Sequence, residues 1–106
     1  MSLKIVRHDA ARSDITSEAY YIAEDNLDAS DRFLQAVEDA FQRLAEFPGM
    51  GVRREYRAST LQDLKMWPVP GFGSYLIFYK ATEEILEIVR VINSARDIAA
   101  IFEVEG

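Results

Sequence analysis

The residues with the clearest chemical potential lie where an apolar segment runs into a predicted helix start. Arg90, Asn93, Arg96 and Asp97 fall within or just after a run of Val, Ile and Leu over residues 85–92. A guanidinium group stays charged and presents forked N–H donors that match carboxylate or phosphate oxygens. These arginines could therefore bind a partner molecule, or they could only tie a helix start to a strand. The sequence leaves both interpretations open.

A second group of basic and aromatic residues lies in the middle of the chain. Residues 48–80 carry five basic and two acidic side chains, a net charge of +3, whereas residues 9–47 carry three basic and ten acidic ones, a net charge of −7. Arginine and tryptophan often anchor protein interfaces, although arginines in loops are also commonly solvated. The two groups together give the candidate partner-binding residues Arg53, Arg54, Arg57, Trp67, Arg90, Asn93 and Arg96.

The sequence offers few residues from which a hydrolytic active site could be built. Cleavage of RNA needs a base, an acid and cations that stabilise the phosphate. The one histidine, His8, stands at a predicted junction between a strand and a helix, which favours packing or capping over catalysis. The only lysines are Lys4, Lys65 and Lys80, and neither metal-ligand spacing nor a phosphate-binding glycine loop occurs. We therefore predict no catalytic residue, no metal site and no cofactor.

The composition sets the broad class of protein. A chain of 106 residues with 49% apolar content predicts a single domain over residues 1–106. The chain has no cysteine and no apolar run approaching the roughly 20 residues that cross a bilayer. We expect a cytoplasmic protein without membrane attachment. Its net charge of −6 disfavours direct nucleic-acid binding, because such binding depends largely on neutralising phosphates.

The elements that must position these residues begin with a short strand at residues 3–7 and a helix at residues 10–25. Apolar residues recur in the helix at spacings of four, four and three, which places them on one stripe. Asp9 is the predicted N-terminal cap. The charged residues between the apolar ones, Asp14 among them, are predicted to face water.

A second helix is predicted after a short break, with Asp28 or Ser30 as its cap and its end near Phe47. Pro48 and Gly49 end it, because proline cannot continue the hydrogen-bond ladder and glycine tolerates left-handed geometry. The short connection between the two helices predicts that they form an antiparallel hairpin.

The second half of the chain is predicted to form mainly strands. We predict a loop at residues 48–63, strands at 64–69, 75–79 and 85–92, and a short C-terminal helix at 95–102. The middle strand is almost continuously apolar, which predicts a central place in the sheet. Together the elements predict an α+β fold in which an N-terminal strand and the helical hairpin join a mostly antiparallel four-stranded sheet. The predicted core includes Phe41, Tyr75, Phe78 and the Ile and Val residues of the last strand.

An ordered set of motifs resembles the ParE branch of the ParE/RelE toxin superfamily over almost the whole chain, from Leu3 to about Phe102. The motifs are PGMG at residues 48–51, WPVPGFGSYLIFY at 67–79 and IVRVINSARDI at 88–98. The resemblance implies a toxin of a type II toxin–antitoxin (plasmid stabilisation) module, neutralised by a cognate antitoxin protein. It implies binding and poisoning of DNA gyrase, and thus a protein-binding toxin rather than an enzyme. A homodimer and a toxin–antitoxin hetero-oligomer both remain open.

Two other functions stay open beside gyrase poisoning. A RelE-like toxin would cleave messenger RNA on the ribosome, and a non-toxic relative would act only as a protein-binding module. The chain carries Asn93 where many ParE-like sequences carry a histidine. An amide cannot transfer protons near neutral pH, which argues against proton-transfer chemistry at this position and keeps the non-toxic alternative open.

Overall fold

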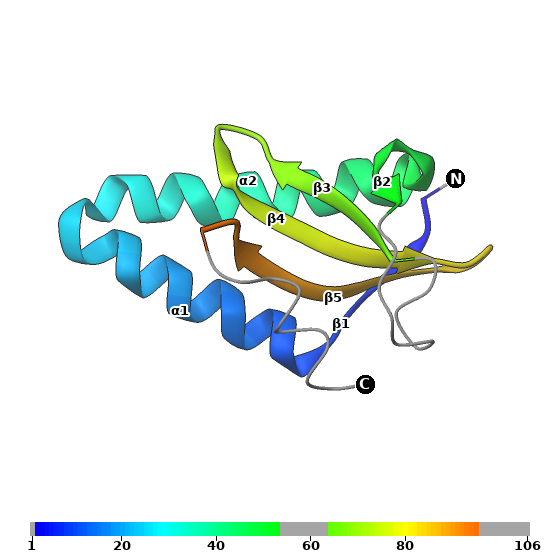
Figure 1. Ribbon diagram of the computed structural model, residues 1–106, viewed down its shortest axis with the longest axis horizontal. Helices are drawn as coiled ribbons and strands as arrows, with labels where there is room; N and C mark the ends of the chain where they lie inside the picture. Colours follow the sequence, from blue (N-terminus) through cyan, green and yellow to red (C-terminus); the bar gives the residue numbers. More distant parts are fainter. Residues whose placement is uncertain (1, 54–63, 96–106) are drawn as a thin grey trace.

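The computed structural model describes residues 2–53 and 64–95, which form two α-helices and a five-stranded sheet (Figure 1). In chain order the elements are β1 (Lys4–Arg7), α1 (Asp9–Asp25), α2 (Leu27–Glu46), the 3-10 helix η1 (Pro48–Met50), β2 (Val52–Arg53), β3 (Lys65–Val69), β4 (Phe72–Ala81) and β5 (Ile85–Asn93). The strand order is β1-β5-β4-β3-β2, with β1 parallel to β5 and the remaining neighbours antiparallel. The predicted α+β fold, a helical hairpin on a mostly antiparallel sheet, is confirmed.

The sheet differs in detail from the prediction. It has five strands among the described residues rather than four, because β2 lies within the predicted loop at residues 48–63. The predicted strand at 75–79 extends over Phe72–Ala81 and occupies the predicted central position. β2 pairs with β3 only at Lys65 and Met66. Pro68 lies beyond this pairing, so the N–H that proline lacks is not needed to bond a neighbouring strand on that side. The predicted helix at 95–102 falls almost wholly outside the described residues.

The connection between the helices is tighter than predicted. A single residue, Asn26, ends α1 and caps α2, with its side-chain Oδ1 accepting from the Ala29 N–H at 3.0 Å. The prediction of Asp28 or Ser30 as the cap is therefore wrong. Ser30 is buried instead, and its hydroxyl donates to the carbonyl of Ala19 at 2.7 Å. This bond joins the two helices near the turn.

The start of α1 also differs from the prediction. His8 is the N-cap residue and makes no side-chain capping bond, whereas Asp9 is already the first residue of the helix. The predicted apolar stripe is confirmed by the burial of Ala11, Ile15 and Ala19. Within the part of the chain that the structure describes, neither helix is long and apolar enough to span a membrane.

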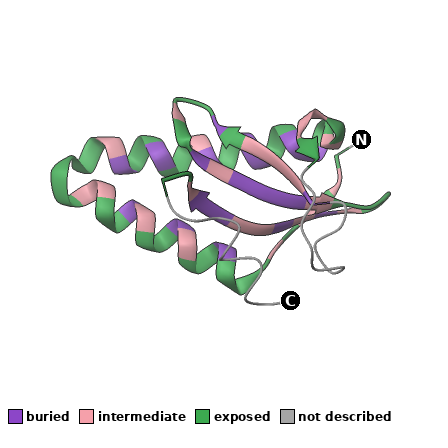
Figure 2. Ribbon diagram, in the orientation of Figure 1, coloured by how far each residue is buried: buried purple, intermediate pink, exposed green. Residues whose placement is uncertain are grey.

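The two faces of the sheet bury different residues of β4. Tyr75, Ile77 and Tyr79 belong to the main core with the helices, whereas Phe78 belongs to a second cluster with Leu64. This alternation is the period of two that a strand imposes on its side chains. Figure 2 shows the buried residues concentrated along β4 and β5 and on parts of both helices.

A β-bulge changes the alternation halfway along β5. Leu86 and Ile88 belong to the main core, but the next core residue is Val91, because the pairing with β4 skips Val89. Val89 is therefore only half-buried, although it was predicted as a core residue. After the bulge the odd-numbered positions share the helix side of the sheet, which brings Asn93 next to α1.

A buried tyrosine holds the PGMG turn against the sheet. The Tyr79 hydroxyl donates to the Pro48 carbonyl and accepts from the Gly51 N–H, both at 2.8 Å. Tyr79 is fully buried, so its hydroxyl cannot bond to water. The two bonds satisfy the O–H donor and one of the acceptor lone pairs of the oxygen. A Cβ atom at Gly51 would overlap the Tyr79 hydroxyl and ring. The turn therefore requires glycine at position 51 because of the tyrosine that lies under it.

The free energy of unfolding should fall as the pH rises above about 10, in part because of Tyr79. Burial raises the pKa of Tyr79, and the bond from the Gly51 N–H offsets this only in part. The folded state thus holds the phenol proton more tightly than the unfolded chain does. This stabilisation is complete below the unfolded pKa and is lost as the pH rises through the folded pKa. Urea unfolding at about pH 9 and about pH 11 should show a smaller loss for Tyr79→Phe than for the wild type, and equal losses would contradict the assignment.

Candidate functional site

An apolar groove of about 310 Å³ runs between α1 and α2 near their connecting turn. Ala19 and Ala23 are small residues that line it, and Tyr20, Leu27 and Leu34 border it with large exposed side chains. Tyr20 is 73% exposed and Leu27 is 71% exposed. Grouped apolar side chains exposed in this way mark interaction surfaces more often than isolated ones do. The groove is therefore a candidate site for the apolar face of a partner.

A second, more polar pocket of about 270 Å³ lies where β5 ends beside α1. Ser17, Glu18 and Tyr21 of α1 line one side, and Asn93 and Ala95 line the other. Asn93 pairs with Tyr75 of β4 in the sheet register, so the pocket lies at the open end of the β4–β5 pair. Its lining combines a carboxylate, a hydroxyl, a phenol and an amide, all of which can accept hydrogen bonds.

One polar group of this pocket, the Asn93 amide, is held by a backbone hydrogen bond. The Tyr75 phenol lies near enough to the side chains of Glu18 and Asn93 for both to affect its pKa. Burial raises the pKa of Tyr75, the nearby Glu18 carboxylate raises it further, and the Asn93 amide lowers it. The Asn93 Oδ1 accepts from the Ala95 N–H at 2.9 Å, which fixes the orientation of its amide. Asn93 thus lies at the pocket as a fixed amide.

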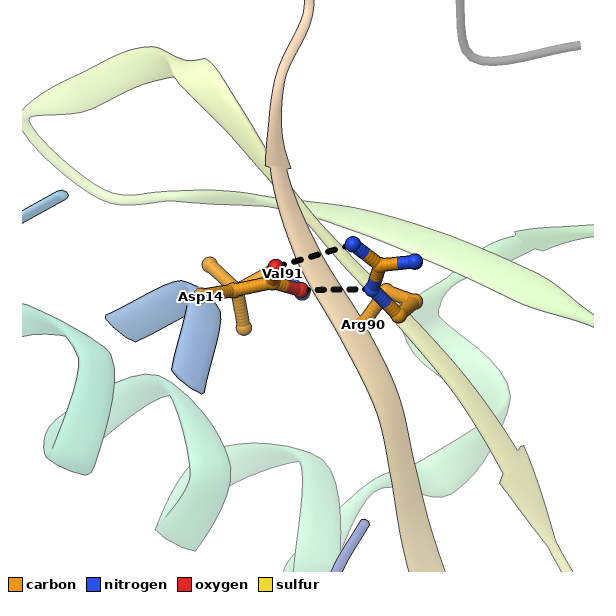
Figure 3. Close-up of polar contacts among 3 residues, drawn as sticks. All are labelled: Asp14, Arg90 and Val91. Atoms are coloured by element: carbon orange, nitrogen blue, oxygen red, sulfur yellow. Dashed lines mark hydrogen bonds and ion pairs between the residues drawn. The ribbon is translucent and has the colours of Figure 1, made fainter. Parts of the chain in front are cut away.

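Arg90 is bound to α1 by a two-pronged ion pair with Asp14. Its Nε and Nη2 donate to the two carboxylate oxygens of Asp14 at 2.7 and 2.9 Å (Figure 3). The Asp14 Oδ2 also accepts from the Val91 backbone N–H at 3.0 Å. The pairing of β1 with β5 ends at Ile88, so Asp14 supplies the acceptor that β1 no longer offers to Val91. Asp14 was predicted to face water, and this prediction is wrong because its side chain is only 14% exposed.

The remaining candidate residues do not all come together. Arg53 is exposed at the end of β2, and Trp67 of β3 is half-buried against the main core rather than standing free. β4 separates them from Arg90 and Asn93 on β5. The other candidates lie outside the described residues: Arg54, Arg57 and Arg96.

The one histidine lies away from both the groove and the pocket. The His8 Nε2 is 3.1 Å from Glu87 Oε1 on β5, and the two side chains are 42% and 38% exposed. The contact connects the start of α1 with the parallel strand pair. Within residues 2–53 and 64–95, no group of three or more His, Asp and Glu side chains could hold a metal ion.

The arrangement thus offers two concave surfaces for binding and an arginine engaged in an internal ion pair. The sequence model of the family described as "ParE toxin of type II toxin-antitoxin system, parDE" matches residues 5–98. This chain belongs to the ParE toxin family. The match spans every described element except the first residue of β1.

A solved structure described as "Chromosomal ParDE TA system from P. aeruginosa" is similar to this ParE-family chain, with a TM-score of 0.67. The alignment covers 87% of this chain and 96% of the other at 10% sequence identity. Such low identity shows a shared fold and nothing finer. A search of curated proteins finds no match.

The structure accounts for two motifs of this ParE-family sequence. The PGMG turn is the segment that Tyr79 holds, and the RVIN segment contains both Arg90 and the pocket residue Asn93. No sequence pattern singled out Asp14, Glu18 or Tyr20, which resemble ordinary outward-facing positions of an amphipathic helix. Glu18 and Tyr21 do stand three residues apart, so they share one side of α1, and this spacing was the only available signal.

Proposed function

We propose that this chain is the toxin of a type II module, that a cognate antitoxin protein neutralises it, and that it poisons DNA gyrase by binding rather than by hydrolysis. Membership of the ParE toxin family supports the first part. The main support for action by binding is the apolar groove between α1 and α2. A protein partner would cover its exposed side chains Tyr20 and Leu27. An amphipathic helix can bury its apolar stripe in such a groove.

Two features support protein binding over cleavage of RNA. Arg90 of β5 already has its Nε and Nη2 on Asp14, so its positive charge is largely compensated and a phosphate would compete with that carboxylate. Asn93 occupies the neighbouring position with an amide that cannot act as an acid or base near neutral pH. The acidic net charge of −6 adds a general repulsion toward nucleic acid.

The proposed target is tested by assaying purified toxin with gyrase and, in parallel, with a translating extract. We expect loss of supercoiling together with accumulation of cleaved DNA, while messenger RNA in the extract stays intact. Cleaved messenger RNA with unaffected gyrase would favour a RelE-like activity instead. Normal growth on induced expression, with neither effect in vitro, would identify a non-toxic binding protein.

The antitoxin interaction is tested by replacing Leu34, which is 39% exposed at the groove, with aspartate. A charge in the groove should weaken antitoxin binding by about 30-fold, because a buried apolar anchor contributes about 2 kcal/mol. Titration calorimetry with the cognate antitoxin measures the change. The matched control is Val52→Asp, an exposed apolar residue of β2 far from the groove (Figure 1). Equal affinities for both variants would exclude the groove as the antitoxin site.

A further inference from the structure

We infer that the pocket formed by Ser17, Glu18, Tyr21 and Asn93 binds an arginine side chain of a protein partner. The inference rests on the proposed function only in taking the partner to be a protein. It concerns a site separate from the apolar groove, since the two cavities share no lining residue.

The pocket is rich in acceptors and holds one negative charge. Glu18 contributes a carboxylate, which can accept about four hydrogen bonds. Ser17 and Tyr21 add oxygens at the rim. No lysine or arginine is among the described residues that line the pocket. The described lining therefore suits a cationic group that carries several N–H donors.

The ring of Tyr21 favours arginine over lysine. Tyr21 is 66% exposed and follows Glu18 by three residues, so its ring and the carboxylate lie on the same side of α1. A guanidinium group can stack on an aromatic ring while its N–H groups bind a carboxylate. An ammonium group has no flat face for such stacking.

The same arrangement already binds an arginine elsewhere in this chain. On α2, Glu38 and Phe41 also stand three residues apart, and they hold the guanidinium of Arg7. The Arg7 Nη2 lies 2.7 Å from Glu38 Oε1, and the Arg7 Cζ lies 5.0 Å from the centroid of the Phe41 ring. Glu18 and Tyr21 repeat this carboxylate and ring pair on α1, beside a cavity instead of an arginine.

The charge of the helical hairpin assists the approach of such a partner. Residues 9–47 carry a net charge of −7, so their field attracts cationic segments from a distance. Because the Ala95 N–H fixes the Asn93 amide, the far wall of the pocket is set before binding. A site ordered in advance loses less entropy when its ligand arrives.

The test uses N-acetyl-arginine-N-methylamide as the probe and the citrulline analogue as its neutral counterpart of the same shape. In titrations followed by amide NMR, the arginine probe should bind with a Kd in the millimolar range, roughly 1–10 mM. Its shifts should centre on residues around Glu18 and Asn93. The citrulline analogue should bind at least about tenfold more weakly, because it lacks the charge. Equal binding of the two probes, or shifts confined to other surfaces, would overturn the proposal.

Variants decide which groups bind the probe. Glu18→Gln removes the negative charge and should reduce arginine binding to the level of citrulline, whereas Tyr21→Leu should weaken it by about 2–5-fold. Asp31→Asn, an exposed carboxylate on α2, is the matched control and should bind as the wild type does. Undiminished binding by Glu18→Gln would overturn the proposal.

Arg96 follows Ala95 directly in the sequence, so Arg96→Ala is titrated in parallel. Binding of the probe by both the wild type and this variant supports a site open to a partner. Binding by the variant alone would mean that the chain fills the pocket with its own arginine, and would overturn the proposal. The probes need neither gyrase nor antitoxin, so failure of this test and failure of the proposed function remain distinguishable.

Discussion

Replacing Asp14 with alanine should lower the free energy of unfolding by about 3 kcal/mol. The carboxylate accepts three hydrogen bonds, two from Arg90 and one from the Val91 backbone. Its removal takes the Asp14 carboxylate away from a guanidinium that is only 20% exposed, and leaves the Val91 backbone donor without this acceptor. Groups left unsatisfied in this way cost more than the original bonds contributed. Urea unfolding at neutral pH measures the change.

Two further substitutions separate charge from hydrogen bonding at this site. Asp14→Asn keeps an oxygen for the Val91 N–H but loses the charge, so it should cost about 2 kcal/mol. Glu24→Ala removes an exposed carboxylate from the same helix and should change stability by less than about 0.5 kcal/mol. If Asp14→Ala costs no more than Glu24→Ala, the ion pair has no structural role.

Replacing Gly51 with alanine should cost about 3 kcal/mol, because the new methyl group would overlap the Tyr79 hydroxyl and ring. The chain can relieve this overlap only by moving the turn, which breaks the two bonds that Tyr79 makes to Pro48 and Gly51. Thermal or urea unfolding of the variant measures the loss. The matched control is Gly49→Ala, in the same turn, where a Cβ would meet nothing within 4 Å. It should be nearly neutral.

A double-mutant cycle with Tyr79→Phe tests the cause of this effect. The single change Tyr79→Phe should cost about 2 kcal/mol, because it leaves the Gly51 N–H and the Pro48 carbonyl without their partner. In that background, Gly51→Ala should cost less than it does in the wild type, since the hydroxyl is gone and its bonds are already lost. Strictly additive losses would show that the turn and the tyrosine do not depend on each other.

The internal ion pair of Arg90 and the polar pocket at Asn93 change how the two residues are interpreted. Both stood out in the sequence as neighbours in one apolar segment and as candidates for the same binding surface. The bulge at Val89 gives them different surroundings: Arg90 binds Asp14 at the edge of β5, whereas Asn93 lines the pocket on the helix side. Their roles therefore need separate tests.

The amino-acid sequence by itself determined both α-helices, four of the five described strands and the class of fold. The helical period of residues 10–25 and the apolar strand at 75–79 are local patterns, and local patterns reflect which face of each element is buried. The resemblance to ParE toxins, confirmed by the family match, likewise rested on short segments that can be read along the chain.

Only the tertiary structure decided which distant residues meet. Asp14 and Glu18 look alike on α1, but Asp14 replaces the missing acceptor beyond the end of β1, while Glu18 lines an open pocket. Tyr79 and Gly51 are 28 residues apart, and their contact depends on how the sheet carries β4 beneath the turn. The helical period predicts on which face of a helix a side chain lies. The packing of the helix against the sheet decides which residues that side chain contacts.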